Sequence, residues 1–366
     1  MRPAIAVTTP LGRCHVFLGR GLLASLGALK PIAEASCLGA LYDHHTKELF
    51  GRIVKRGLKR RSPIELEVRA GERSKTMATA SRLLEVLAEG GADRRSLVVA
   101  CGGGVVTDLG GFVASLYMRG VDWVAVPTTL LAAVDAAIGG KTGVDLPQGK
   151  NLAGTIHPPK AVVIDLDAFR SLSARQWRSG LAEVVKIALA LDGDFFELLE
   201  REAERGALEP ENPQIEAIVR RAIELKAHVV ERDERDSGIR RVLNLGHTTG
   251  HALEAATGYR RFLHGEAVAI GLRVACELAV ERTTLRRSDA DRVVRLLSSC
   301  GLQTAWPFRL RVEQTLRRAA LDKKAEGGRL RVILPTKIGS AAVTSAEWRD
   351  LARAASRCRT KITAEM

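Results

Sequence analysis

Residues 96–108, SLVVACGGGVVTD, hold the pattern that decides the fold of this 366-residue chain. A short apolar run, residues 96–100, is followed by three glycines and then by a helical segment, which predicts a buried strand, a tight turn and a helix. Two more such runs, residues 123–127 and 161–164, also end in glycine-rich or polar turns. The chain up to about residue 170 is therefore predicted to be an α/β domain with a parallel sheet.

The second half of the sequence has a different periodicity. From about Ala174 onward it shows long helical patterns, as in residues 214–231 and 288–297, with one late strand at 330–334. The change near Leu172 predicts two domains, residues 1–172 and residues 173–366, the second mainly α-helical. The basic tail after Ser345 is expected to be a solvated helix.

The composition indicates a soluble globular protein. Apolar residues make up 46% of the chain, enough for a full core. Arg273 and Glu277 interrupt the apolar stretch 267–280 before the roughly 20 residues of a membrane span, and no signal peptide is visible, so we expect a cytoplasmic protein. The six cysteines form no CxxC pair and are expected to be reduced thiols.

The formal net charge of +14 raises the question of nucleic-acid binding. Basic residues are spread along the chain and aromatic residues make up only 4%, so no stacking platform is visible. An arginine-rich surface with a cationic pocket for an anionic small substrate is the better interpretation.

The glycine turn, residues 101–108, is a candidate phosphate site. Glycines between a strand and a helix let backbone N–H groups approach a phosphate, as in a nucleotide pyrophosphate. The spacing is not G-x-G-x-x-G, and a tight turn with Thr107 or Asp108 capping the helix is the alternative. Thr128 and Thr129 follow the next strand, so we expect them at the same edge of the sheet.

Residues 134–151, VDAAIGGKTGVDLPQGKN, combine polar side chains with four glycines. Asp135, Lys141, Lys150 and Asn151 are residue types that orient a polyhydroxylated or phosphorylated ligand. The glycines favour close approach of the backbone to something, and an ordinary exposed loop is the alternative.

Metal-type residues gather in the second half. Glu183 and Lys186 are three apart and share a helix face, and His247 and His251, four apart, do so if their segment is helical. A glutamate with two histidines is a zinc set that leaves one position open. With His264 there are three candidate histidines, and spacing does not decide which two bind. Helix-capping or core histidines are the alternative.

Eight motifs resemble one family. They are, in order, GGGVVTDLGGF, MRGV, PTTLLAAVDAAIGGKTGV, GKNLAG, SGLAEVVK, LNLGHTTGHALE, HGEAVAIG and DKK. Over about residues 43–335 the chain resembles the 3-dehydroquinate synthase family of the shikimate pathway, which serves chorismate and aromatic amino acid biosynthesis. The resemblance implies an NAD- and zinc-dependent sugar phosphate cyclase, with a Rossmann-like N-terminal domain and a helical C-terminal domain, that usually forms a homodimer.

The resemblance also implies residue roles. Zinc, or cobalt in its place, would be bound by Glu183, His247 and His264. The residues implied for NAD are Asp43, Glu72, Lys75, Gly103, Gly104, Asp108, Thr128, Thr129 and Lys150. Those implied for the substrate, 3-deoxy-D-arabino-heptulosonate 7-phosphate, are Asp135, Lys141, Asn151, Lys186, Lys226, Arg240, Asn244, His251 and Lys324. Arg119 would reach the phosphate bound by the neighbouring subunit, which makes the dimer part of the active site.

The family's reaction explains this mixture of residue types. NAD oxidises the C5 alcohol, phosphate is eliminated, the ketone is reduced again, and an aldol step closes the ring to 3-dehydroquinate. NAD is therefore not consumed. Zinc would act as a Lewis acid, and the lysines, arginine and amides would hold a substrate that carries a carboxylate and a phosphate.

Some positions depart from the family pattern on the cofactor side. Ala133, Ala136 and Ala137 lie in a segment that members commonly read Q-V-D-S-S, Thr107 lies where they read G-D-L, and Gln176 lies in the segment that usually ends T-L-P-x-R-E. We predict that NAD binds more weakly than in typical members.

Three other functions compete with this one. Another sugar phosphate cyclase, such as an aminodehydroquinate or valiolone-type synthase, would use the same metal and NAD, but the intact Lys226, Arg240, Asn244 and Lys324 favour the heptulosonate. A polyol dehydrogenase would accumulate NADH. A non-enzymatic basic binding protein leaves the ordered glutamate, histidine and lysine set unexplained.

Overall fold

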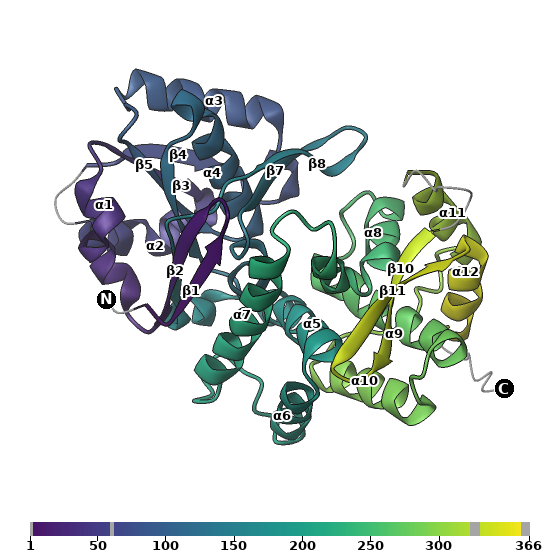
Figure 1. The fold of residues 1–366 in the computed structure, drawn as a ribbon. Helices are drawn as coiled ribbons and strands as arrows, with labels where there is room; N and C mark the ends of the chain where they lie inside the picture. The colour runs from purple at the N-terminus through teal and green to yellow at the C-terminus, as the bar shows by residue number, and fades with distance from the viewer. Residues whose placement is uncertain (1–2, 59–61, 323–329, 360–366) are drawn as a thin grey trace. The chain divides into compact units, whose positions relative to one another are not determined.

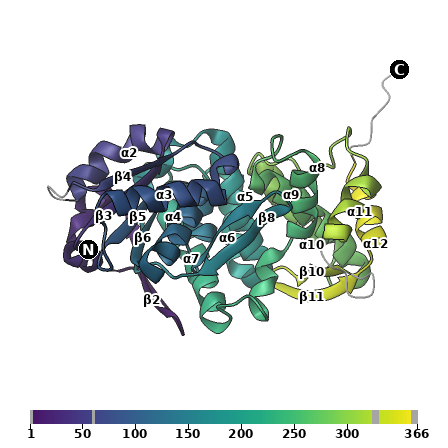
Figure 2. The same ribbon diagram turned by 90° about the horizontal axis from the view of Figure 1, so that it is seen from above.

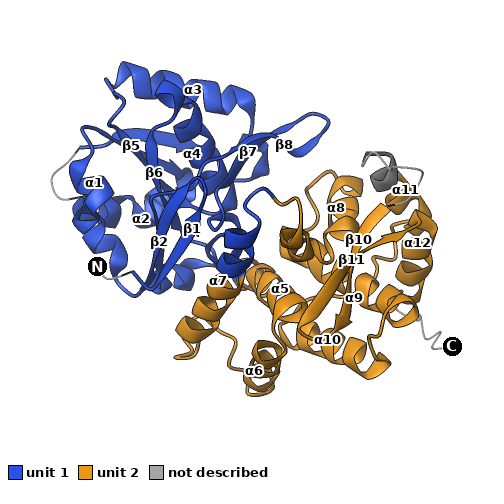
Figure 3. Cartoon of the chain, in the orientation of Figure 1, with its two compact units in different colours: residues 1–173, 226–235 blue, residues 174–225, 236–366 orange. Residues whose placement is uncertain are grey.

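The computed structural model describes residues 3–58, 62–322 and 330–359 (Figures 1 and 2). The chain forms two compact units (Figure 3). Unit 1 comprises Met1–Ser173 and Lys226–Arg235, and unit 2 comprises Ala174–Leu225 and Asp236–Met366. One long helix, α7 (Ile215–Arg232), is thus divided between the two units.

Unit 1 is built on a seven-stranded sheet with the order β1-β2-β9-β6-β5-β3-β4, in which only β1 and β2 pair antiparallel. Its strands are β1 (Ile5–Thr9), β2 (Gly12–Gly19), β3 (Leu38–Asp43), β4 (Ile64–Val68), β5 (Leu97–Gly102), β6 (Asp122–Pro127) and β9 (Ala161–Asp165). The three strands predicted at 96–100, 123–127 and 161–164 are confirmed as β5, β6 and β9.

The sheet of unit 1 is covered on both faces, which is why β5 is apolar throughout. Alternate residues Leu97, Val99 and Cys101 belong to the core that also holds Phe50 and Val54 of α2 (His44–Gly57). The opposite face meets α4 (Gly104–Leu116), where a Cβ added to Gly110 would lie 2.5 Å from the Ala100 Cβ. Glycine therefore lets α4 lie directly on β5.

The glycine-rich segment after η4 (Ala132–Ala136) is a hairpin, and the exposed-loop interpretation is wrong for this part of the chain. Strands β7 (Lys141–Leu146) and β8 (Gly149–Ile156) pair antiparallel. A Cβ on Gly143 would lie 2.6 Å from the Ala153 carbonyl oxygen, and one on Gly154 would lie 2.2 Å from that of Thr142. These glycines allow close approach of the partner strand, so they need no ligand to explain them.

Unit 2 is mainly helical, with one hairpin. Its elements are α5 (Ala174–Leu191), α6 (Gly193–Glu204), the first part of α7, α8 (His247–Ala256), α9 (His264–Arg282), α10 (Arg287–Ser299), α11 (Val312–Asp322), β10 (Leu330–Lys337), β11 (Ser340–Ala346) and α12 (Trp348–Arg357). Helix α9 is central and packs against α5, α8, α10 and α12. The helices predicted at 214–231 and 288–297 and the strand at 330–334 are confirmed as α7, α10 and β10.

The expectation of a solvated C-terminal helix is wrong. Helix α12 buries Leu351, Ala354 and Ala355 and packs on α9. The buried Asp350 accepts an ion pair from Arg282 at 2.8 Å. The helix is amphipathic: its exposed charged residues lie on one face, and its apolar face completes the core of unit 2.

The cysteines are all unpaired, as expected for reduced thiols. Five are buried, and burial raises the pKa of Cys14 to about 12. Within the described ranges, no helix combines the length and apolarity that a membrane span requires.

Candidate functional site

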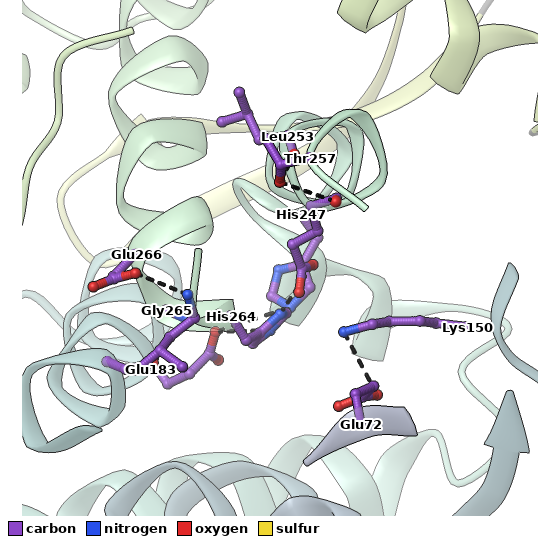
Figure 4. Close-up of polar contacts among 12 residues, drawn as sticks. Glu72, Lys150, Glu183, His247, Leu253, Thr257, His264, Gly265 and Glu266 are labelled. Carbon is purple, nitrogen blue, oxygen red and sulfur yellow. Dashed lines mark hydrogen bonds and ion pairs between the residues drawn. The ribbon is translucent and has the colours of Figure 1, made fainter. Parts of the chain in front are cut away.

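Three potential metal ligands converge in unit 2 (Figure 4). Glu183 lies in α5, while His247 and His264 are the first residues of α8 and α9. The Nε2 atoms of the two histidines are 3.3 Å apart. The Oε1 atom of Glu183 lies 3.6 Å from Nε2 of His264 and 3.9 Å from Nε2 of His247. Three residues separated by up to 81 positions thus present their donor atoms to one point.

Two close backbone contacts bring these helix starts together. A Cβ on Gly265 would lie 1.9 Å from the carbonyl oxygen of Ser179, and the Gly265 N–H donates to the Ser179 hydroxyl at 3.0 Å. This contact holds the first turn of α9 on α5. A Cβ on Gly271 would lie 2.0 Å from the carbonyl oxygen of Gly246, which holds the first turn of α8 on α9. Glycine at 265 and 271 is therefore what sets the distances among the three ligands.

The donor set fits a divalent cation. Glu183 is 0% exposed; its Oε2 forms an ion pair with Lys186, and its Oε1 faces the Nε2 atoms of both histidines. A carboxylate oxygen and two imidazole nitrogens that converge in a buried position are a typical ligand set for zinc. Two nitrogens bound to one tetrahedral zinc ion would be roughly 3.3 Å apart, which matches the separation of the two Nε2 atoms.

The Nδ1 atoms of both histidines have acceptors of their own. His247 Nδ1 lies 3.2 Å from the Leu245 carbonyl oxygen, and His264 Nδ1 lies 3.4 Å from Oε2 of Glu254. A proton on each Nδ1 leaves the Nε2 lone pair for a metal. This arrangement is not one that helix capping or plain core packing requires.

His251 belongs to a second grouping. With Glu254 and His264 it forms another set whose donor atoms lie within 4.8 Å of one another, but His251 is exposed. The set with buried Glu183 offers the drier site. Sequence reasoning missed Glu254, although it lies seven residues after His247 and so shares a helix face with it.

Two of the expected substrate-binding cations are buried in unit 2. Lys186 is 1% exposed and Arg240, in η6 (Ile239–Asn244), is 4% exposed. Asn244 ends the same element. In unit 1, Lys226 donates to both the backbone and the side-chain oxygen of Asp135. Lys324 lies outside the described residues.

The glycine turn lies at the carboxyl edge of the unit 1 sheet, as predicted. Gly102 pairs with Pro127 at the ends of β5 and β6, and the Thr128 N–H donates to the Gly102 carbonyl at 2.9 Å. Helix α4 starts after Gly103 without a side-chain cap. The capping alternative is therefore wrong: the Thr107 hydroxyl donates to the carbonyl of Gly104 at 3.1 Å. Uncapped N–H groups at a helix start favour an anion.

Charged side chains around this edge form pairs. Buried Lys75 contacts Asp108 and the side-chain oxygen of Asn151. Burial alone would lower the pKa of Lys75, but Asp108 and Glu72 outweigh it and raise this pKa above its ordinary value. Lys150 lies 3.5 Å from Glu72 (Figure 4).

Three other expected residues lie in unit 1. Asp43 caps α2, where its Oδ1 accepts the Thr46 N–H at 2.9 Å. Lys141 is the exposed first residue of β7. Arg119 has a left-handed backbone, φ 70, directly after Met118 with φ 49. Such strain in consecutive non-glycine residues is typical of functional loops.

The residues that depart from the family pattern differ in burial and in distance from the glycine turn. Ala133 and Ala137 are buried, and the Ala136 Cβ lies 3.6 Å from the position a Cβ on Gly104 would take. Ala136 is therefore next to the glycine turn. Gln176 is an exposed residue of α5.

Two family models and many relatives of known function match most of the chain. The family model described as 3-dehydroquinate synthase N-terminal matches residues 65–179, and the one described as 3-dehydroquinate synthase C-terminal matches residues 180–325. The 3-dehydroquinate synthase of Pelotomaculum thermopropionicum is 44% identical over 333 residues, which cover 90% of this chain and 89% of the relative.

Solved structures show the same fold. A 2-deoxy-scyllo-inosose synthase complexed with carbaglucose-6-phosphate, NAD+ and Co2+ matches with a TM-score of 0.88 at 25% identity, covering 97% of this chain and 99% of the other. The 2-epi-5-epi-valiolone synthase from Streptomyces hygroscopicus subsp. jinggangensis 5008, with NAD+ and Zn2+ bound, matches with a TM-score of 0.84 at 29% identity, covering 98% of each chain. The predicted fold class, an α/β part followed by a mainly helical part, is confirmed.

Proposed function

Because the chain belongs to the 3-dehydroquinate synthase family, we propose that it converts 3-deoxy-D-arabino-heptulosonate 7-phosphate to 3-dehydroquinate and phosphate. The observation that carries this proposal is the convergence of Glu183, His247 and His264 on one point of unit 2. The 44% identity to a curated 3-dehydroquinate synthase supports the choice of substrate.

We assign zinc to Glu183, His247 and His264, with cobalt as an alternative metal. The two solved cyclases carry NAD+ together with Co2+ or Zn2+, which supports both cofactors. When bound, the metal ion supplies a Lewis acid for oxygen atoms of the substrate. When bound, NAD supplies the hydride acceptor. For NAD we propose the uncapped α4 start and the residues around it, namely Asp43, Glu72, Lys75, Gly103, Gly104, Asp108, Thr128, Thr129 and Lys150.

The chain's own charged groups would bind and orient the substrate. Lys186 and Arg240 are buried cations, and each is suited to a carboxylate or a phosphate, arginine through a bidentate fork. The remaining residues that we propose for the substrate are Asp135, Lys141, Asn151, Lys226, Asn244, His251 and Lys324, with Arg119 acting on the neighbouring subunit. Fixed cations of this kind lower the barrier mainly by positioning and electrostatic stabilisation.

The domain assignment, the homodimer and the cytoplasmic location are also proposals. We propose that residues 1–172 carry the cofactor and residues 173–366 the metal and most of the substrate contacts. The strained backbone at Arg119 supports a functional role for its loop. Size-exclusion chromatography with light scattering and cell fractionation test the last two points.

The main competing function is that of another sugar phosphate cyclase. The two solved structures reported above are a 2-deoxy-scyllo-inosose synthase and a 2-epi-5-epi-valiolone synthase. Buried Arg240 and Lys186 are suited to a substrate that carries both a carboxylate and a phosphate, which supports the heptulosonate phosphate.

The deciding experiment incubates the zinc-loaded protein with NAD and the heptulosonate phosphate, following phosphate and 3-dehydroquinate. Both products in equal amounts, without accumulation of NADH, are expected. Net NADH would indicate a dehydrogenase instead. Turnover of a carboxylate-free sugar phosphate, with none of the heptulosonate, would indicate a different cyclase.

A further inference from the structure

Glu254 is a buried carboxylate beside the metal centre that no role described so far uses. It lies on α8, is 2% exposed, and places Oε2 3.4 Å from Nδ1 of His264. This distance is at the long end of the hydrogen-bond range. A buried carboxylate is costly to keep, so its position against a histidine ring needs a reason.

The position of Glu254 sets the tautomer of His264. Nδ1 of this histidine faces the carboxylate, whereas Nε2 faces the Nε2 of His247 and the Oε1 of Glu183. An acceptor at Nδ1 favours the Nδ1–H tautomer, which leaves the lone pair on the side where the potential ligands converge.

His247 has a different orienting partner. Its Nδ1 lies 3.2 Å from the Leu245 carbonyl oxygen, which is neutral and belongs to the backbone. His264 has a charged side chain at the corresponding atom. A carboxylate also increases the electron density that the imidazole offers to a cation.

We propose that Glu254 is a positioning residue: it holds His264 in the Nδ1–H tautomer and thereby strengthens divalent-metal binding at Glu183, His247 and His264. The proposal rests on the metal site of the proposed function but not on the substrate or on NAD. Glu254 does not bind the metal in this proposal, although its donor atoms also group with those of His251 and His264.

The test measures zinc affinity by competition with a chromophoric chelator, with no substrate or NAD present. Glu254→Ala removes the acceptor and the charge and is expected to weaken zinc binding by about 10- to 100-fold. Glu254→Gln keeps an acceptor oxygen and should fall between that variant and the parent. Glu202→Gln removes another buried carboxylate of unit 2, on α6, and should bind zinc like the parent.

A second readout separates positioning from loss of folding. In the metal-free protein, ¹⁵N shifts of the His264 ring should report the Nδ1–H tautomer, and Glu254→Ala should shift the population toward Nε2–H while its urea unfolding midpoint remains measurable. Zinc affinity of Glu254→Ala within twofold of the parent overturns the proposal. A second outcome also overturns it. If the parent binds two zinc ions and Glu254→Ala binds one, Glu254 is itself a metal ligand. Failure of dehydroquinate synthesis with these zinc results intact would count against the proposed function alone.

Discussion

The proposed metal site of unit 2 and the carboxyl edge of the unit 1 sheet, the proposed cofactor edge, are both rich in charge, but their charged groups are arranged differently. In unit 2, Oε2 of buried Glu183 pairs with Lys186, and Oε1 faces the Nε2 atoms of His247 and His264. In unit 1, Lys75 contacts both Asp108 and Asn151, and Lys150 lies near Glu72. The first site directs three donor atoms at one point and so suits a metal ion, whereas the charged groups of the second site pair with one another.

This difference teaches how each site should respond to its ligand. A metal ion bound by three converging donor atoms binds the folded state and not the unfolded chain, so metal should stabilise unit 2. Ligands at the cofactor edge must compete with existing ion pairs, so their binding should be weaker than the number of charged groups suggests.

The largest effect is expected where backbone contact sets the metal geometry. In Gly265→Ala the new Cβ would lie 1.9 Å from a carbonyl oxygen of α5, so α9 must move and carry His264 with it. We expect a loss of more than about 3 kcal/mol in the free energy of unfolding, measured in urea, together with weaker zinc binding. Gly193→Ala, whose nearest neighbour would be 3.4 Å away, is the control. Parent-like unfolding and zinc binding in Gly265→Ala would show that these contacts do not set the site.

Lys75→Met tests whether the cofactor edge is balanced internally. It leaves Asp108 without its counter-charge in a largely buried position, which should cost about 3 kcal/mol of unfolding free energy. The double variant Lys75→Met/Asp108→Leu should recover most of this loss. Lys47→Met removes exposed ion pairs with Glu65 and Glu67 and should cost less than about 1 kcal/mol. A double variant as unstable as the single one contradicts the comparison.

Zinc should stabilise the protein through unit 2. At 100 times its dissociation constant, zinc should add about 2.7 kcal/mol to the free energy of unfolding, seen as a raised Tm. Glu183→Ala should abolish this shift, and Mg²⁺, which prefers a shell of oxygen ligands, should not produce it in the parent. An equal shift in Glu183→Ala would place the zinc site elsewhere.

The smallest effect concerns the alanines beside the glycine turn. Ala136→Ser restores the residue type common in the family next to Gly104 and should tighten NAD binding, within about tenfold or 1.4 kcal/mol. Isothermal titration of NAD measures it, with the exposed Ala78→Ser of α3 (Met77–Glu89) as the control. If the parent binds NAD tightly and Ala136→Ser binds it equally well, these alanines do not weaken NAD binding.

The sequence predicted those strands and helices whose own residues show the pattern of burial. The apolar runs of β5, β6 and β9 and the periodicity of α7 and α10 are visible in sequence because each element buries its own face. The shared edge of the two polar turns follows from parallel pairing. Strand β4, IELEV, was missed because charged residues alternate with the buried ones at the edge of the sheet.

Tertiary contacts explain what could not be predicted. Nothing in the spacing of three histidines shows that Gly265 meets Ser179 or that Gly271 meets Gly246, yet these contacts bring His264 and His247 together near Glu183. The role of Glu254 beside His264 depends on the same packing. The glycines of β7 and β8 predicted a close approach of the backbone, but the sequence does not show that a partner strand is what approaches.

The division of α7 between the units has a consequence for how the protein is made. Thr8 near the start of the chain donates its N–H to Glu231 at 2.8 Å, and Asp135 pairs with Lys226. On the ribosome, unit 1 cannot complete these contacts until 52 residues of unit 2, residues 174–225, have also been synthesised. A nascent chain released after residue 173 would expose the surfaces that the end of α7 covers. Synthesis of this enzyme therefore couples the maturation of its first unit to the translation of its second.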